Sequence, residues 1–336
     1  MSRRGFVLIV ILFFTVLLMS GIASFLRRST LDAAIVRNRE YAARAEALAR
    51  GGVRLGVVLL QQDLLDEQDA ELPAPIDTLG DVWARASELQ VETDDGGLLR
   101  LQIEDAASRL DLNAVRIAGE NEGKREDLFA WLRDFLAKVI EEMPGRKEEK
   151  PWDPEELARN LMDYVDEDDV AMRGEPEDAW YQQQDPPYRA WNLPLLSLED
   201  LALVKGFERP LVEALRPYAT VYPFEGKGVN PNTAPTWVAA ALHLGGATDK
   251  RLASEDDVKQ LVKTRGELPI CGEGESNRCG AWPAAGVTTF PPSDQVHSDV
   301  FTVTATATYG DVRRSVEAVV DRKDPAKPAL YAWRVR

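Results

Sequence analysis

The pattern of hydrophobic and polar positions changes character along the chain. Residues 6–26 contain no formal charge, and a helix of this length crosses the roughly 30 Å hydrocarbon core of a bilayer. Residues 27–66 contain no proline, are rich in Ala, Leu and Arg, and repeat apolar residues at helical spacing. We therefore expect one long helix, half in a membrane and half against a folded domain. Gly51-Gly52 is the point where this helix is expected to bend.

Alternation with a period of two follows at both ends of the remaining chain. Residues 98–106 alternate between apolar and polar side chains, and residues 300–322 hold two such runs around Tyr309-Gly310-Asp311, the turn of a predicted hairpin. Residues 330–336 predict a further strand. If these strands pair, residues 112–297 form an insertion into one α+β domain.

Helical spacing dominates the predicted insertion. Its helix signals are apolar residues at i, i+3, i+4 and i+7 and capping residues such as Asp153 before Pro154. They predict a compact helical bundle without a convincing fixed-period repeat. The segments concerned are 125–143, 153–170, 197–207 and 232–246.

Composition and charge narrow the classes of function. The chain has 336 residues, of which 45% are hydrophobic and 29% charged, as in a globular protein with one membrane segment. Its formal net charge is -16, so its surface repels phosphate backbones and anionic headgroups. Nucleic acid is therefore not expected as a partner.

The N-terminus admits three interpretations. Arg3 and Arg4 favour a cytoplasmic start with the rest of the chain on the other side of the membrane. In the first interpretation the segment is a secretory signal that is removed near Gly21-Ile22-Ala23. In the second it is a plain membrane anchor. The third rests on "RRGFVLIVILFF", which resembles the class III leader of type IV pilins and type II secretion pseudopilins. This resemblance implies that a prepilin peptidase cuts between Gly5 and Phe6 and that the new N-terminal Phe6 is methylated.

Several internal stretches resemble one pseudopilin family. They are "DLNAV" at 111–115, "YVDEDDVAMRGEPEDAWY" at 164–181, "YRAWNLPLLSLEDLALVKGF" at 188–207 and "VNPNTA" at 229–234. In this order, behind a pilin-like start, they resemble general secretion pathway protein K, the large minor pseudopilin of type II secretion. The resemblance covers nearly the whole chain.

The resemblance implies a fold, a place and partners. The fold is α+β and type IV pilin-like, a long N-terminal transmembrane helix packed on an antiparallel sheet, with a large and mostly α-helical inserted domain. The protein would sit in the inner membrane with its bulk in the periplasm, at the tip of a pseudopilus that serves protein export, and would have no catalytic activity. The implied partners are other minor pseudopilins, the major pseudopilin, the inner-membrane assembly platform and prepilin peptidase.

The expected division of the chain follows from the helix, the strands and the resemblance. We expect a leader at 1–5, a transmembrane part of the helix at 6–26 and its periplasmic part at 27–66. The pilin-like domain is expected from two segments, 67–111 and 298–336. The inserted α-helical domain is expected between them, at 112–297.

One position departs from the general pilin pattern. Counted from Phe6, the fifth residue is Val10. Most pilins and pseudopilins have a glutamate here, whose negative charge balances the positive N-terminus of the subunit above. A subunit at the tip has no subunit above it. Val10 therefore suits a tip position, although valine is also an ordinary residue of membrane helices.

An acidic loop is the candidate for a bound ion. Oxygen ligands beside the flexible Gly174 suit Ca²⁺, but EF-hand spacing is missing, so a solvated acidic loop is the alternative. The resemblance adds calcium binding in this helical region. We expect the ligands Asp166, Asp168, Glu177 and Asp178, with Asp163 a weaker candidate. Against the single cation Arg173, the loop carries Asp163, Asp166, Glu167, Asp168, Asp169, Glu175, Glu177 and Asp178.

The only two cysteines, Cys271 and Cys279, flank a loop rich in Gly and polar residues. Two thiols outside the cytoplasm usually pair, and closing so small a loop contributes about 2 to 3 kcal/mol. Their spacing excludes a CxxC redox pair, and zinc would need histidines nearby. We therefore predict a structural disulfide.

Enzymatic and DNA-binding functions have little support. No Ser or Cys adjoins His243, predicted near the end of a helix. Ser298 directly follows His297, but GxSxG and HExxH motifs are missing. The segment around Gly206-Phe207-Glu208 resembles a helix-hairpin-helix, but Glu208 replaces the glycine that would approach a phosphate. The runner-up to the secretion function is a minor pilin at the tip of a type IV pilus.

Overall fold

The computed structural model describes most of the chain. Statements about the fold refer to the following ranges: 3–68, 75–118, 122–145, 150–172, 174–224, 228–246, 249–271, 278–284, 286–324 and 326–336.

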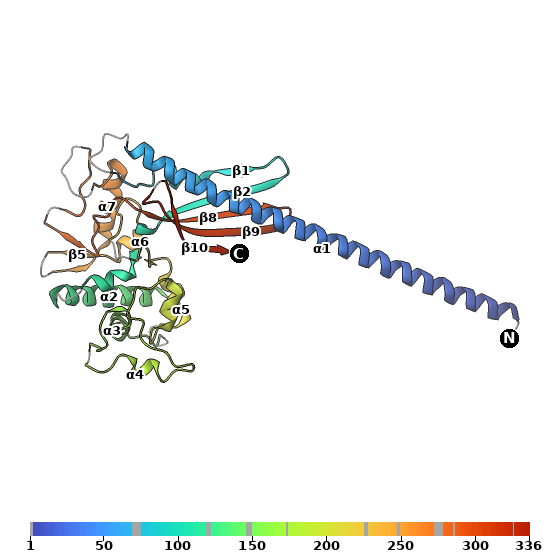
Figure 1. Cartoon of the computed structure of the whole chain (residues 1–336), viewed down its shortest axis with the longest axis horizontal. Coiled ribbons are helices and arrows are strands. Elements are labelled where there is room, and N and C mark those ends of the chain that lie inside the picture. Colours follow the sequence, from blue (N-terminus) through green and yellow to red (C-terminus); the bar gives the residue numbers. More distant parts are fainter. Residues whose placement is uncertain are drawn as a thin grey trace.

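One helix, α1 (Arg3–Gln68), forms the spine of the molecule. Its apolar first part is exposed and projects away from the folded body, whereas its last third lies along the sheet (Figure 1). The helix continues unbroken through Gly51 and Gly52, where the sequence suggested a bend. A Cβ at Gly52 would lie 2.8 Å from Ala305 Cβ, and one at Gly56 would lie 2.5 Å from Val303 Cγ1. These two glycines therefore let the helix approach the sheet closely.

The sheet has five antiparallel strands in the order β1-β2-β8-β9-β10. The predicted pairing of distant strands is present, because β2 pairs with β8 from Gly97↔Tyr309 to Asp105↔Phe301. Strands β8 and β9 form the predicted hairpin around Gly310, whose φ is 52°. The strands are β1 (Gln90–Glu92), β2 (Gly97–Asp105), β8 (Val300–Tyr309), β9 (Val312–Asp321) and β10 (Ala329–Val335).

Side chains on one face of this sheet pack against α1. In β8 the apolar residues are fully buried while the threonines between them are only partly buried. Small residues suit this face because the helix lies close. The core between α1 and the sheet contains Ala45, Ala49, Val53, Leu60, Leu101, Ile103, Phe301, Val303, Ala305, Ala307, Val316 and Val320.

Apart from η1, the remaining elements lie between β2 and β8 in the chain and have a second core. Longer helices alternate with short ones and with minor strands. Before the insertion lies η1 (Ala84–Glu88). The elements between β2 and β8 are η2 (Ala106–Ser108), β3 (Leu110–Asp111), η3 (Leu112–Ala118), α2 (Glu122–Glu142), α3 (Pro154–Val165), α4 (Asp178–Tyr181), η5 (Leu198–Leu203), α5 (Arg209–Leu215), β4 (Ala219–Thr220), α6 (Thr236–Ala239), β5 (His243–Gly245), β6 (Arg251–Leu252), α7 (Glu255–Glu267) and β7 (Thr288–Phe290).

This second core is centred on α2 and α3. Trp131 and Phe135 of α2 are completely buried, and their rings stack with centroids 5.6 Å apart. Leu157 and Leu161 of α3 and Leu211 of α5 belong to the same cluster. The pilin-like fold with a large, mostly helical insertion is therefore confirmed. The exact domain boundaries given above stay predictions.

Three helix predictions differ from the structure. The helix expected over 232–246 is wrong for most of its length, because only Thr236–Ala239 is helical and His243–Gly245 pairs as a strand with β6 and β7. The segment 197–207 is a 3₁₀ helix over Leu198–Leu203, closed by a capping box at Ser197. Helix α3 begins after Asp153 as predicted but ends at Val165, because Asp166 is extended.

Candidate functional site

The N-terminal positions lie on the free part of α1. Phe6 and Val10 are exposed on this helix, and Gly5 lies in its first turns. Met1 and Ser2, the beginning of the predicted leader, lie outside the described residues. Cleavage between Gly5 and Phe6 and methylation of Phe6 stay predictions.

A tight reversal of the chain builds the acidic site at the end of α3. Val170 and Pro176 form an antiparallel bridge, and the Ala171 N–H donates to the Glu175 carbonyl at 2.9 Å. Gly174 occupies the turn with a φ of 81°, a value that favours glycine. This reversal returns Glu177 to the C-terminal end of α3. Arg173, the one cation of the loop, lies outside the described residues.

Three carboxylates meet at this point. One oxygen from each of Asp163, Asp166 and Glu177 lies within 4.8 Å of the other two. Asp163 Oδ1 accepts the Met172 N–H at 3.0 Å, and Asp166 Oδ2 accepts from Arg125 Nη2 at 3.0 Å. Arg125 therefore contacts one of three acidic groups, next to the negative end of a helix dipole, and the charge of Arg159 also acts on Asp163. The cluster has the charge and the oxygen donors of a cation site.

The remaining oxygens of the cluster point to the same chemistry. Among the described residues, no N–H or hydroxyl group donates to Asp166 Oδ1 or to the two buried carboxylate oxygens of Glu177, and these two carboxyl groups face each other. Burial, and then the charges of Asp166 and Asp163, raise the pKa of Glu177 to about 8. Burial and the charge of Asp168 raise the pKa of Asp166 to about 6. A hard divalent cation would supply the missing partner and keep both groups ionised.

Two of the predicted ligands lie apart from this cluster. Asp168 Oδ1 accepts the Val170 N–H at 2.8 Å and shapes the loop. Asp178 Oδ1 accepts the Ala190 N–H at 3.0 Å, and its other oxygen lies 3.6 Å from Arg189 Nε. The geometric cluster therefore keeps the predicted Asp166 and Glu177 and contains the weaker candidate Asp163. The spacing of residues in the sequence gives no sign that Glu177 returns onto α3, beside Asp163.

The asparagines of the motifs "DLNAV" and "VNPNTA" act as structural clamps. Asn113 donates from Nδ2 to the Leu195 and Val221 carbonyls and accepts the Leu195 N–H. Asn232 joins both backbone groups of Ile270 in the same way, with distances of 2.9 and 2.8 Å. A side-chain amide can pair with one donor and one acceptor of a passing strand. These motifs therefore hold the insertion together.

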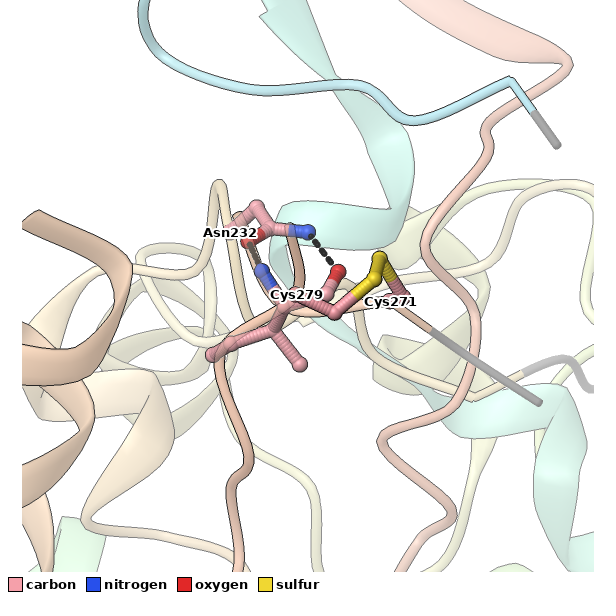
Figure 2. The surroundings of a disulfide bond; sticks show 4 residues. Asn232, Cys271 and Cys279 are labelled. Atoms are coloured by element: carbon pink, nitrogen blue, oxygen red, sulfur yellow. Dashed lines mark hydrogen bonds between the residues drawn. A yellow bond between two sulfur atoms is a disulfide. The ribbon is translucent and has the colours of Figure 1, made fainter. Parts of the chain in front are cut away.

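The predicted disulfide is present next to one of these clamps. Cys271 and Cys279 are bonded, with their Cα atoms 5.5 Å apart. Figure 2 shows Asn232 beside this bond, and its amide is hydrogen-bonded to the backbone of Ile270, the residue before Cys271. The disulfide and the clamp fix the same short stretch, and a bridge between Ile270 and Gly280 adds to them.

A buried arginine joins α1 to the sheet. Arg322 is 1% exposed; its Nη1 donates to Asp63 Oδ2 at 2.9 Å, and its Nη2 to Asp77 Oδ1 at 2.5 Å. Its guanidinium carbon lies 4.4 Å from the centre of the Phe301 ring. Asp63, Asp77 and Asp81 form a second group of close carboxylates, but Arg322 already forms ion pairs with two of them. Sequence analysis missed this residue because its partners lie more than two hundred positions away.

His243 and the hairpin-like motif have packing roles. His243 Nε2 lies 3.1 Å from Asp134 Oδ2, and burial lowers the pKa of His243. The predicted helix-end position of His243 is wrong, since it lies in β5. Gly206 has a φ of 86°, and Phe207 is buried in the core of the insertion. The Gly206 turn therefore packs inside the protein.

An uncharged, membrane-length helix that continues as the spine of an antiparallel sheet defines the pilin-like class of proteins. Within that class, residues 108–224 match the family described as type II secretion system (T2SS), protein K. The type II secretion system protein K of Pseudomonas aeruginosa (strain PAO1) is 31% identical over 244 residues, which is 72% of this chain and 68% of that protein. The chain belongs to the type II secretion system protein K family.

Other relatives agree with this assignment. A protein K relative from Escherichia coli (strain K12) is 28% identical over 179 residues, 53% of this chain, and the match spans half (50%) of the relative's length. A chain in the crystal structure of the GspK-GspI-GspJ complex from enterotoxigenic Escherichia coli has the same fold. Its TM-score is 0.62 at 17% identity, and the match covers 90% of this chain and 99% of that one.

The family places the chain in a functional class. Its members are structural components of a secretion system, and this chain is a minor pseudopilin. Within the described ranges one helix, α1, is long and apolar enough to cross a membrane, which fits a single-pass protein of the inner membrane.

Proposed function

We propose that this minor pseudopilin stands at the tip of the pseudopilus, where it helps to start assembly and closes the fibre. The supporting observation is the position of the insertion. It lies at the end of the molecule opposite the free N-terminal part of α1 (Figure 1). With that helix in the membrane, the insertion occupies the outward end, where it would obstruct a subunit stacked above.

Val10 supports the same position. An unpaired charge in hydrocarbon costs roughly several kcal/mol, so a glutamate here would need the N-terminus of a further subunit as its partner. Val10 carries no charge and lies on the exposed apolar part of α1. A subunit at the tip has no subunit above it, and because Val10 is uncharged, no charge is left unpaired there.

The other minor pseudopilins are the proposed partners. The structural neighbour forms a complex named GspK-GspI-GspJ. In this chain, Leu55 and Val58 of α1 and Trp333 and Val335 of the edge strand β10 are exposed apolar residues of the pilin-like body. We expect such residues to become covered when the subunits assemble, with further contacts to the major pseudopilin and the assembly platform.

Processing precedes assembly in this proposal. Prepilin peptidase would cut between Gly5 and Phe6 on the cytoplasmic side, and the mature helix would remain in the membrane with the bulk of the chain in the periplasm. N-terminal sequencing of the processed protein tests this step. A sequence that starts with Phe6 supports it, and one that starts at Ser24 or retains Met1 contradicts it.

Immunogold labelling of sheared pseudopili tests the tip position. An epitope tag in the exposed segment 185–187 of the insertion should label one end of each fibre. Labels distributed along the fibre would contradict a tip role. As a control, a tag on the major pseudopilin should label the whole length.

Calcium at the acidic cluster is a second part of the proposal. The support is the cluster of Asp163, Asp166 and Glu177 and its buried carboxylate oxygens. These carboxylates would hold the ion, and an ion that accepts six to eight oxygens in loose geometry suits an open site of this kind. The ion would fasten the 170–177 reversal to the end of α3 and so shape the surface of the insertion.

A further inference from the structure

A continuous buried network joins the membrane helix to the insertion. It starts at Asp63 of α1 and passes through Arg322 to Asp77, which is completely buried. The Ser298 N–H donates to Asp77 Oδ2 at 2.6 Å, and the Asp77 N–H donates to the Val296 carbonyl at 2.8 Å. Helix, sheet and the segment before β8 therefore meet at one aspartate.

The same network continues into the insertion. Asn230 Nδ2 donates to the Asp77 carbonyl and to Asp105 Oδ2, each at 3.1 Å. Thr233 Oγ1 donates to Asp105 Oδ2 at 2.6 Å. Asn230 and Thr233 belong to "VNPNTA", and Asp105 ends β2. We call this network, Asp63 to Thr233, the joint, because it connects the two cores by hydrogen bonds.

The joint contains more acidic groups than cations. Arg322 is its one permanent cation among the described residues. His297 lies at its edge and is 31% exposed at the side chain, with Nδ1 3.1 Å from Asp77 Oδ2 and Nε2 3.8 Å from Asp299 Oδ1. Several carboxylates belong to the joint or border it. Some contact Arg322 or His297 directly, and others interact through their charge. These carboxylates are Asp63, Asp77, Asp81, Asp105 and Asp299.

We propose that the joint is a proton-sensitive coupling, in which proton uptake by His297 and the surrounding carboxylates tightens the attachment of the insertion to α1 and the sheet. The imidazolium carries a proton on both nitrogens. Its positive charge therefore lies 3.1 Å from Asp77 Oδ2 at Nδ1 and 3.8 Å from Asp299 Oδ1 at Nε2. The neutral ring offers a single proton and no charge, so the excess negative charge of the joint is then less well balanced.

The carboxylates of the joint change in the same direction. Burial raises the pKa of Asp63 to about 6, and burial together with the charge of Asp77 raises the pKa of Asp105 to about 6. Mild acid therefore loads the joint with protons, and the insertion is held most firmly under those conditions.

Hydrogen exchange of the full chain in detergent micelles tests this proposal. Protection factors at pH 5.5 and 7.5, corrected for intrinsic exchange, are compared for peptides that cover 76–78, 229–233 and 296–299. We expect about tenfold more protection at pH 5.5, the equivalent of one pKa unit. The β8–β9 hairpin, whose backbone pairs within the sheet, provides the internal reference and should change little.

Two variants sharpen the measurement. His297→Gln keeps a polar side chain but cannot take up the proton, so the pH response of the three joint segments should shrink. His243→Gln, which removes the chain's other histidine, should leave that response intact. A joint with the same protection at both pH values in the wild type, or an undiminished response in His297→Gln, would overturn the proposal. The wild-type comparison decides even where a variant does not fold.

Discussion

The pilin-like body and the insertion are held together by different means. In the body, regular elements meet face to face, and its core consists largely of alternating apolar residues of β2, β8 and β9 packed on α1. The insertion combines an apolar core around α2 and α3 with short helices, short strands and side chains that bind distant backbone groups. Asn113 and Asn232 are such side chains.

This difference explains how each region resists change. A face of a sheet tolerates exchange of one apolar side chain for another of similar volume, because its backbone bonds are complete within the strands. A clamp depends on one amide that satisfies a donor and an acceptor at once, and nothing else nearby replaces it. Apart from the buried Arg322–Asp63 pair, we therefore expect the body to be sensitive mainly to lost volume and the insertion also to be sensitive to lost polar partners.

Removal of a large core ring should separate the two regions most clearly. Phe301 of the body and Phe135 of the insertion are both completely buried. Phe301→Ala should lower the free energy of unfolding of the body by about 3–5 kcal/mol, and Phe135→Ala should do the same for the insertion. Hydrogen exchange resolved by segment measures both effects. Equal weakening of both regions by either variant would show that they unfold as one unit.

Loss of an amide clamp should affect the insertion alone. Asn232→Leu leaves the buried N–H and carbonyl of Ile270 without partners, which costs about 1–3 kcal/mol for each group. Asn160→Ala is the matched control. It removes one partly buried bond to the Lys205 carbonyl and should cost about 1 kcal/mol. Chemical denaturation measures the difference, and similar losses in both variants would contradict the clamp role.

Calcium should stabilise the insertion and leave the body unchanged. At a free concentration of 100 times Kd, one bound ion adds about 2.7 kcal/mol to the free energy of unfolding. A chelator should therefore lower the Tm of the wild type but not of Glu177→Gln. Glu175→Gln, which changes an exposed carboxylate of the same chain reversal, should keep the response. An unchanged Tm of the wild type after chelation would remove the calcium site.

Mild acid should give the smallest effect. In Asp63 and Asp105 the folded-state pKa is raised to about 6, above the ordinary 3.8. Their contribution to stability is therefore fully present below about pH 3.8 and is lost as the pH rises through about 6. The Tm should be higher at pH 5.5 than at pH 7.5, and the dependence should be flatter in Asp105→Asn. A Tm that rises with pH over this interval would contradict these shifts.

The sequence alone determined the regular parts of this protein. The uncharged run of residues 6–26, the proline-free segment after it and the alternation around Tyr309-Gly310-Asp311 predicted α1, β8 and β9. The ordered motifs predicted the family, which the relatives confirm. Periodicity carries this information because the spacing of apolar residues along a helix or strand shows which of its faces is buried.

Only the tertiary structure decided the irregular parts and the sites. It placed Asp163 beside Glu177, gave Arg322 its two aspartates and turned residues 243–245 into a strand of a small sheet. Each of these outcomes depends on groups far apart in the chain, whose approach no local spacing records. The hydrogen bonds of a polar side chain can be made with water or with a buried partner. Its role can therefore be recognised only when the position of that partner is known.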